Sequence, residues 1–452
     1  MNAYEQKKMP FPSSLAFVWQ RLHDAGKECY AVGGCVRDFL RGVTPDDYDL
    51  TTSATPTEVM EIFSDVRTVP TGLAHGTVTV VVDGVPIEVT TFRIDGNYED
   101  CRHPDAVCFT DSFREDCARR DFTVNAMGYS PDKGLVDFFD GLRDLERGII
   151  RTVGDAQKRF EEDALRILRA LRFSSTLGFF IDKDTEAAIH LMTPRLAHVA
   201  NERIYAELSK LLMGKDVFRV LSDYRDVIAF ILPELQPALD FNQNNRHHCY
   251  DVYMHTVHAV AAIPPTLVLR LAALFHDIGK PGVYSEDENG EGHFYGHAAL
   301  SAELTERGLR RLRADGDTLR RVVKLVHRHD DVIEETPVAV RRCLSRHGEE
   351  YFFDMLALKR ADNLAQAPDY SDRQVYLDRL EEMARAELEA KRCLSLQDLA
   401  IDGTDAMARG IPKGPLVGEA LAYLLDEALA GTVANEKDAL LDALDDWKAR
   451  KT

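Results

Sequence analysis

The chain has 452 residues, of which 45% are hydrophobic and 29% are charged. These values are typical of a folded protein and exclude a disordered, collagen-like or coiled-coil chain, and no apolar run reaches the ~18 residues of a membrane span. The net charge of −20 excludes a uniformly basic coat for nucleic acid. At roughly 150 residues per domain, the length predicts about three domains, or a head with an extended body.

Neither the N-terminus nor the cysteines indicate export. Residues 1–14 contain no apolar core of a signal peptide. The eight cysteines form no C-x-x-C pair, which disfavours a zinc knuckle or a thioredoxin-like site. Scattered thiols are typical of a reducing compartment. We therefore expect a cytoplasmic protein without a membrane partner, and a monomer is favoured although the sequence leaves the oligomeric state open.

The N-terminal third is predicted to be mixed α/β. Residues 12–26 have helical spacing, and Cys29–Val32 is a short apolar strand. Thr77–Val82 and Val85–Phe92 are rich in β-branched residues and flank Asp83-Gly84, a strong hairpin-turn pair. Beyond about residue 150 the strand signals stop and helical periodicity continues to the end. The predicted fold class is therefore α+β, with a small mixed sheet and flanking helices followed by an all-α body.

The first chemical motif is Gly33-Gly34-Cys35-Val36-Arg37-Asp38, between the first strand and a helix. Two glycines at such a turn let backbone N–H groups approach a phosphate, and the helix N-terminus adds partial positive charge. A simple tight turn is the alternative.

Asp47 and Asp49 form a candidate metal site. Residues i and i+2 of a strand point to the same face, so the two carboxylates would project together. Carboxylates at this spacing could hold one or two Mg²⁺ ions, which can activate a hydroxyl and neutralise a leaving pyrophosphate. An acidic turn before a strand is the alternative. Glu88, a charge inside an apolar strand, fits either a third metal-site carboxylate or a surface position.

Two further segments carry candidate nucleotide contacts. In Arg119-Arg120-Asp121-Phe122-Thr123-Val124-Asn125, arginine could grip a triphosphate while the aspartate and asparagine suit ribose hydroxyls. Residues 157–173 are predicted to form one amphipathic helix, with Asp163, Arg166 and Arg169 outside its apolar stripe. Asp163 and Arg166 either pair as a surface salt bridge or offer a donor and an acceptor that match cytosine and adenine but not guanine or uracil.

In this order, the motifs resemble the class II tRNA nucleotidyltransferases, a family of bacterial CCA-adding enzymes and poly(A) polymerases. Glu202-Arg203…Glu207…Lys210 completes the set, which covers at least residues 30–215. The resemblance implies a nucleotidyltransferase head over residues 1–150, followed by a helical neck over 151–240 that reads the base and binds RNA. Residues 94–118 match the flexible loop that is associated with the switch from C to A.

The resemblance also implies a reaction and its site residues. It implies template-independent addition of C, C and A to the tRNA 3′ end from CTP and ATP, with release of pyrophosphate and Mg²⁺ held by Asp47 and Asp49. The implied nucleotide-binding residues are Gly33, Gly34, Arg37, Asp38, Arg120, Asp121, Asn125, Asp163, Arg166 and Arg169. A poly(A) polymerase and a CC- or A-adding specialist are alternatives, although the Glu162–Arg166 motif favours CCA addition.

A second candidate metal site lies in the histidine-rich segment 247–362. Its residues are His255, His276, Asp277, His297, His327, His329 and Asp362. A lone histidine is commonly structural, but this ordered set predicts a metal site, and its mixed N/O ligands suit a transition metal (Mn, Ni, Co or Fe) more than Mg²⁺.

The order is similar to that of the HD superfamily of metal-dependent phosphohydrolases. The resemblance implies core ligands His255, His276, Asp277 and Asp362, with His297 and one of His327 or His329 completing a two-metal site. It implies an HD domain over 241–370 and a helical tail over 371–452. The HD domain is either active or structural, and an HD phosphohydrolase with a non-catalytic head is a further alternative for the whole chain.

Two basic stretches stand out in the acidic chain. Residues 151–220 contain 12 basic and 10 acidic side chains, and residues 306–329 contain 8 basic and 3 acidic side chains. The stretches, with net charges of +2 and +5, are either RNA-contacting surfaces or ordinary solvated helix faces.

Overall fold

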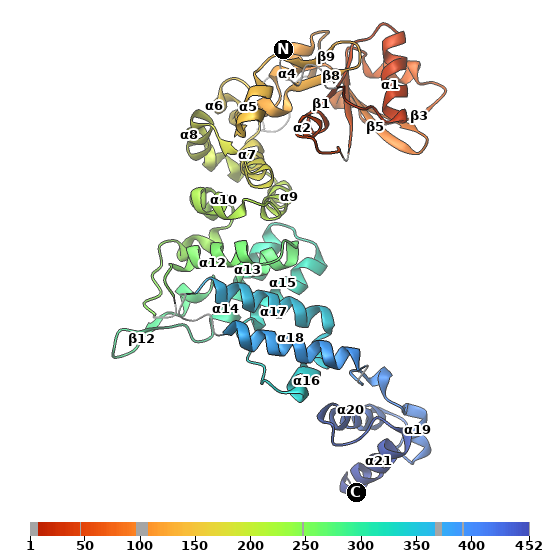
Figure 1. The fold of residues 1–452 in the computed structure, drawn as a ribbon, viewed down its shortest axis with the longest axis vertical. Helices are drawn as coiled ribbons and strands as arrows, with labels where there is room; N and C mark the ends of the chain where they lie inside the picture. The colour runs from red at the N-terminus through yellow and green to blue at the C-terminus, as the bar shows by residue number, and fades with distance from the viewer. Residues whose placement is uncertain are drawn as a thin grey trace. The chain divides into compact units, whose positions relative to one another are not determined.

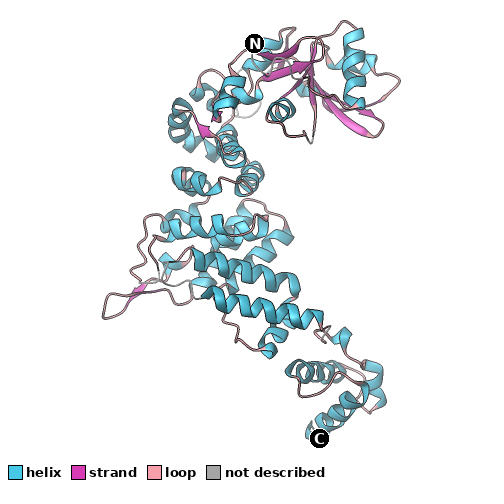
Figure 2. Ribbon diagram, viewed as in Figure 1, coloured by secondary structure: helices cyan, strands magenta, loops and turns pink. Residues whose placement is uncertain are grey.

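The computed structural model describes residues 8–45, 47–95, 107–245, 248–366, 373–390 and 393–451. It divides into two units, Met1–Pro233 and Glu234–Thr452. The predicted α+β class is confirmed, because the large sheet lies in the first unit and the second unit is almost entirely helical (Figures 1 and 2). None of the described helices has the length and apolar character that a membrane span requires.

A seven-stranded sheet organises the head, in the order β3-β4-β5-β2-β1-β8-β9. Its strands are β1 Cys29–Val32, β2 Asp49–Thr52, β3 Arg67–Gly72, β4 Thr77–Val82, β5 Val85–Thr91, β8 Met127–Ser130 and β9 Gly134–Asp137. β2 and β5 pair in parallel, whereas the other neighbours are antiparallel. The predicted hairpin is confirmed, because Asp83 and Gly84 join β4 to β5 with φ angles of 51° and 81°, as a type I′ turn requires.

Helices and short strands surround this sheet and continue into the neck. The helices are α1 Ser13–Asp24, α2 Gly34–Leu40, α3 Pro56–Ile62, α4 Phe113–Ala118, α5 Gly141–Arg147, α6 Ala156–Glu162, α7 Leu165–Leu177, α8 Lys183–Met192, α9 Asn201–Leu212, α10 Val217–Asp223 and α11 Arg225–Ile231. The short strand pairs are β6 Arg93–Asp95 with β7 Val107–Phe109, and β10 Ile149–Ile150 with β11 Phe180–Ile181. The 3₁₀ turns are η1 Leu73–His75, η2 Thr123–Asn125 and η3 Thr193–His198.

The prediction of a single helix over residues 157–173 is wrong. The helix breaks at Asp163, where the backbone is extended with φ −147° and ψ 104°. The side-chain oxygen Oδ1 of Asp163 accepts a hydrogen bond of 3.0 Å from the backbone N–H of Leu165. Aspartate competes with helical hydrogen bonding in this way, so the break follows from its chemistry. As a result, Asp163 and Arg166 do not lie one turn apart on one helix.

The second unit is a helical body with a small helical tail. Its helices are α12 Val252–Ala262, α13 Leu267–Phe275, α14 His297–Arg311, α15 Gly316–Arg328, α16 Pro337–His347, α17 Glu349–Leu364, α18 Arg373–Glu389, α19 Gly403–Ala408, α20 Pro415–Ala430 and α21 Lys437–Lys451. The remaining elements are η4 Pro233–Ala238 at the junction, η5 Lys280–Gly282, η7 Leu396–Asp398 and the ribbon β12 Ser285–Glu286 with β13 Gly292–His293. This ribbon and β11 depart from the predicted absence of strands beyond residue 150, because two-residue strands leave no periodicity in a sequence.

One close backbone contact shapes the body next to its histidine cluster. A Cβ atom on Gly279 would lie 2.6 Å from both the carbonyl oxygen of His297 and the backbone nitrogen of Ser301. Only glycine therefore lets the loop after α13 contact the start of α14. This approach brings His297 close to Asp277.

Candidate functional site

Three carboxylates gather at one end of the parallel strand pair. Asp49 is the first residue of β2 and lies opposite Glu88 of β5 in the register, and Asp47 lies just before the strand. Asp49 is exposed at the start of the strand, but partial desolvation of its carboxylate together with the negative charges of Asp47 and Glu88 raises the pKa of Asp49 to about 6. The excess negative charge makes this end of the sheet attractive to a cation.

Two arginines face the turn between β1 and α2. Gly33 has a φ of 75°, a left-handed conformation that favours glycine. A Cβ atom on Gly33 would lie 3.7 Å from Nη1 of Arg120, and one on Gly34 would lie 3.7 Å from Nη2 of Arg37. Arg37 is held by Asp38 at 2.9 Å. The backbone of Gly33 and Gly34, which carries no side chains, thus lies next to two guanidinium groups. A site for an anion requires such groups.

A network of buried polar side chains connects this turn to the neck. Arg37 donates to Oδ1 of Asn125 at 2.8 Å, and Asn125 donates to Oδ1 of Asp121 at 3.2 Å. Arg169 of α7 donates to Oδ2 of Asp121 at 2.8 and 2.5 Å. Burial alone would raise the pKa of Asp121, but Arg169 and Asn125 hold it at about 2. Arg169 also lies 3.8 Å from Glu207 of α9.

The two residues expected to read the base have separate partners. Asp163 pairs with Arg203 of α9 at 2.8 Å. Arg166 pairs with Glu162 at 2.5 Å and donates to the carbonyl oxygen of Arg119 at 3.0 Å. The simple i,i+3 salt bridge between Asp163 and Arg166, the alternative considered from the sequence, is not among the ion pairs of the described residues.

Asp116 is a site residue that the sequence reasoning missed. Its side chain is fully buried on α4 and contacts both Arg119 and Arg120. The sequence held a signal, because an acid three and four residues before two arginines is placed to pair with both when the residues between them are helical. Within the flexible loop expected over 94–118, residues 96–106 lie outside the described residues.

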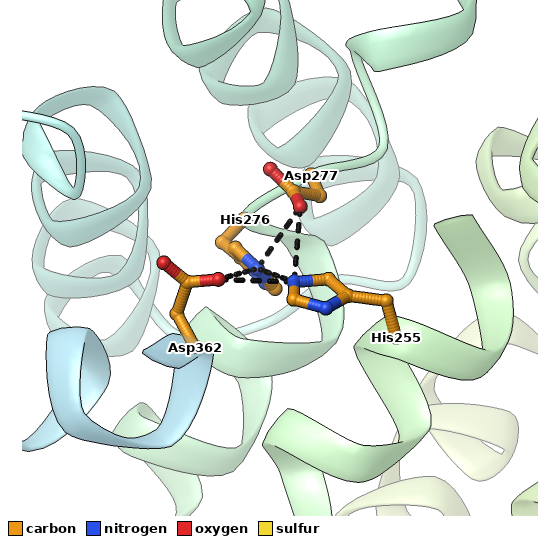
Figure 3. Close-up of side chains that lie close together, drawn as sticks. All are labelled: His255, His276, Asp277 and Asp362. Carbon is orange, nitrogen blue, oxygen red and sulfur yellow. Dashed lines mark hydrogen bonds and ion pairs between the residues drawn. The ribbon is translucent and has the colours of Figure 1, made fainter. Parts of the chain in front are cut away.

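Four histidines of the second unit meet two carboxylates in its interior. His255 and His276 each approach Asp277 and Asp362, with Nε2 to oxygen distances of 3.0 to 3.7 Å (Figure 3). The other oxygen of Asp277 lies 3.3 Å from Nε2 of His297 and 3.6 Å from Nε2 of His329. Asp277 therefore belongs to both groups of potential metal ligands. His327, in the last turn of α15, is exposed and stays outside the cluster, whereas His329 directly follows the helix.

The hydrogen bonds of the Nδ1 atoms of these histidines direct their Nε2 atoms toward the carboxylates. In each ring, Nδ1 lies 2.7 to 3.1 Å from a backbone carbonyl oxygen, so Nδ1 carries the proton. In the neutral rings Nε2 is then an acceptor. Nevertheless, Nε2 of His255 lies 3.3 Å from Nε2 of His276, and those of His297 and His329 are 3.1 Å apart. Burial alone would lower the pKa of His276, but the charges and hydrogen bonds of Asp277 and Asp362 raise it to about 10.

This cluster opens onto a cavity of about 320 Å³. The walls of the cavity include Lys280, Tyr295 and Arg373 besides cluster residues. Lys280, which received no role from the sequence, is buried and lies 2.6 Å from Oδ2 of Asp277. A small anion entering the cavity would meet cationic side chains beside the potential metal ligands.

The basic stretch 306–329 is partly neutralised within the fold. Five of its arginines pair with carboxylates: Arg310 with Glu306, Arg311 with Glu234, Arg320 with Asp317, Arg321 with Glu350 and Asp354, and Arg328 with Asp331. Three of these arginines, Arg311, Arg321 and Arg328, pair with carboxylates outside the stretch, which offsets part of its net charge of +5.

Three family models match the chain. They are the poly A polymerase head domain over residues 29–151, the probable RNA and SrmB-binding site of polymerase A over 178–239, and tRNA nucleotidyltransferase domain 2 over 295–444. Together they cover parts of both units.

Curated relatives of this chain include CCA-adding enzymes. That of Lactiplantibacillus plantarum is 33% identical over 431 residues, which cover 94% of this chain and 93% of the relative. That of Leuconostoc mesenteroides is 49% identical over 214 residues, which span 47% of this chain and about half (53%) of the relative. The crystal structure of the Bacillus stearothermophilus CCA-adding enzyme in complex with CTP has a TM-score of 0.72 and 30% identity, covering 98% of this chain and 99% of that one. Because the L. plantarum match extends over nearly both full lengths, the chain belongs to the family of CCA-adding enzymes.

Proposed function

We propose that this chain adds C, C and A in turn to the 3′ end of tRNA, using CTP and ATP and releasing pyrophosphate. The observation that carries the proposal is the parallel register that sets Asp49 opposite Glu88. Arg120, at the Gly33 turn, is close enough for its charge to act on Asp49. Carboxylates for a cation and a guanidinium for a triphosphate are thus combined, and the near full-length similarity to a CCA-adding enzyme supports the choice of substrates.

The carboxylates suit Mg²⁺, a hard cation that prefers oxygen ligands. The raised pKa of Asp49 supports this assignment, because the protein itself leaves the negative charge there unbalanced. Asp47 and Asp49 would hold the ions, with Glu88 as a third ligand. When bound, two Mg²⁺ ions activate the attacking hydroxyl and neutralise the leaving pyrophosphate.

The other residues bind and orient the reactants. Arg37 and Arg120 grip the triphosphate, and Asp163 and Arg166 read the base edge, exchanging part of their pairing with Arg203 and Glu162 for the nucleotide. The tRNA 3′ oxygen forms a bond to the α-phosphorus, the bond to pyrophosphate breaks, and the hydroxyl proton passes to solvent.

The test uses a tRNA transcript that lacks its terminal CCA. The purified chain is incubated with Mg²⁺ and CTP, ATP or both, and the products are resolved at single-nucleotide length. We expect two additions with CTP and a third when ATP is present. Asp49→Asn should abolish them, whereas Asp83→Asn, the same change at the tip of the hairpin, should not. A stop after two additions would indicate a CC-adding specialist, and a long tail from ATP alone a poly(A) polymerase.

A second activity, a metal-dependent phosphohydrolase of the HD type, is favoured by the cluster around Asp277. In each of two groups of side chains, His255, His276, Asp277 and Asp362 and then Asp277, His297 and His329, the potential ligand atoms lie within 4.8 Å of one another, so one cation could bind each group. Nitrogen and carboxylate donors suit Mn, Fe, Co or Ni. An ion of this kind, held by these ligands, would supply activation of water for attack on phosphorus, while Lys280 and Arg373 of the adjoining cavity would attract a phosphoester.

Metal analysis and a chromogenic substrate test this second activity. We expect the cluster around Asp277 to hold about two Mn²⁺ ions. We expect the chain to hydrolyse bis(p-nitrophenyl) phosphate. His329→Ala should lose metal and hydrolysis, whereas His327→Ala, two residues away on the exposed side, should keep both. Equal metal content in the two variants would contradict the assignment. If the chain hydrolyses the phosphoester but does not extend the tRNA, the result would indicate a non-catalytic head.

A further inference from the structure

Asp116 is a fully buried carboxylate in the head, which no step proposed above uses. It lies on α4, between the β6–β7 strand pair and the Arg119-Arg120 pair. Removing a carboxylate from water costs several kcal/mol unless strong partners compensate. The partners of the Asp116 carboxylate therefore indicate its role.

The carboxylate contacts three separate parts of the head. Oδ1 accepts from Nε and Nη2 of Arg119 at 3.0 and 2.7 Å, and from the backbone N–H of Arg93 at 3.4 Å. Oδ2 accepts from Nη2 of Arg120 at 3.1 Å and lies 3.3 Å from the hydroxyl of Thr51. Thr51 is on β2, two residues after Asp49, so it lies on the same face of the strand.

Both arginines lead to proposed nucleotide contacts. Nη1 of Arg120 faces the Gly33 turn, and the positive charge of Arg120 lowers the pKa of Asp49 against the other influences there. The carbonyl oxygen of Arg119 accepts from Nη2 of Arg166 at 3.0 Å. The end of α4 therefore contacts the phosphate side and the base side of the site.

The packing of α4 does not depend on this charge. Phe113, at the other end of the helix, stacks on Tyr30 with ring centroids 4.1 Å apart. Cys117 joins the same apolar cluster. A Cβ atom on Gly128 would come within 2.3 Å of the Phe113 ring, so the ring fills that space closely. The apolar contacts of α4 thus come from Phe113 and Cys117, whereas the carboxylate of Asp116 fixes the direction of two guanidinium groups.

We infer that Asp116 is a positioning residue that couples base selection to the phosphate grip, by holding Arg119 and Arg120 against the strand that carries Asp49. The inference rests on the proposed nucleotidyl transfer. Loss of the charge should leave Arg120 free to turn away from the Gly33 space and should loosen the carbonyl that holds Arg166. Rate and base discrimination should therefore fall together.

The test compares Asp116→Asn with Glu115→Gln, the same loss of charge at the next, exposed position of α4. Single-turnover addition to a tRNA transcript without CCA is measured with CTP and with UTP. For Asp116→Asn we expect about a tenfold loss of rate with CTP and about a tenfold loss of the CTP-to-UTP ratio, the scale of a charged hydrogen bond. Glu115→Gln should match the wild type in both.

If Asp116 acts in folding alone, Asp116→Asn should lower the melting temperature and leave the CTP-to-UTP ratio unchanged, and that result would overturn the inference. An unchanged rate of addition with CTP would overturn it too. If Asp116→Asn does not fold, as judged by circular dichroism, Arg119→Lys decides. It keeps the buried charge paired but removes the two-pronged contact, and an unchanged ratio in this variant would refute the coupling. Failure of the wild type to extend the tRNA would instead refute the proposed nucleotidyl transfer.

Discussion

Replacing Asp121 with asparagine tests whether the buried network of the head stabilises the fold. Asp121 is 8% exposed, so solvent screens its pairing with Arg169 little. A pKa of about 2 instead of the ordinary 3.8 corresponds, at about 1.4 kcal/mol per pKa unit, to about 2 kcal/mol of stability. Because the pKa is lowered on folding, this contribution is complete above pH 4 and disappears as the pH falls through 2.

Urea unfolding followed by tryptophan fluorescence measures this contribution. The chain has two tryptophans, and in a Trp447→Phe background only Trp19 of the head reports. We expect Asp121→Asn to lower the free energy of unfolding by about 2 kcal/mol at every pH from 5 to 8, with a smaller difference below pH 4. A difference below about 0.5 kcal/mol, the range of ordinary surface changes, would refute the argument. So would a difference that grows as the pH falls.

Three further changes probe other parts of the molecule. Gly279→Ala should destabilise the second unit by about 1–3 kcal/mol and reduce its metal content, because the new Cβ would clash with backbone 2.6 Å away; unchanged thermal unfolding and metal content would contradict this. Thr55→Ala removes the capping box of α3 and should cost about 1 kcal/mol in the same urea assay, whereas Thr432→Ala in the second unit should leave the Trp19 transition unchanged. Chelation should lower the unfolding midpoint of the wild type but not of Asp277→Asn, since only the wild type holds the shared ligand; equal shifts would exclude a structural metal at this cluster.

The sheet of the head was largely predictable because its signals are local. Cys29–Val32 and Thr77–Val82 were predicted with the bounds that the structure has, and the hairpin between β4 and β5 follows from one Asp-Gly pair. The break at Asp163 was not predictable from periodicity, since the apolar stripe continues across it. At this position the Asp163 side chain accepts a hydrogen bond from the backbone in place of a helical one. The spacing of apolar residues contains no information about such a side-chain hydrogen bond.

The candidate sites also contain features that local sequence patterns predicted and features that they did not. Spacing predicted that Asp47 and Asp49 belong together, but β2 begins only at Asp49, and its pairing with Glu88 depends on a parallel register that no local pattern encodes. Similarly, sequence left His327 and His329 as equal choices. In the structure His327 is exposed in the last turn of α15, whereas His329, just after the helix, is buried. Asp116 went unnoticed because its partners come from β2 and β6 as well as from the two residues that follow its own helix.

The place of β1 in the sheet has a consequence for synthesis on the ribosome. Its Ala31 pairs with Tyr129 of β8, about 100 residues farther along, so at roughly 5–20 residues per second one edge of β1 waits about 5–20 s for its partner. During that time the turn that starts at Gly33 is incomplete on its β8 side. An open strand edge can pair with other chains. Slow codons between β1 and β8 would therefore lower the yield of folded protein more than slow codons after residue 130.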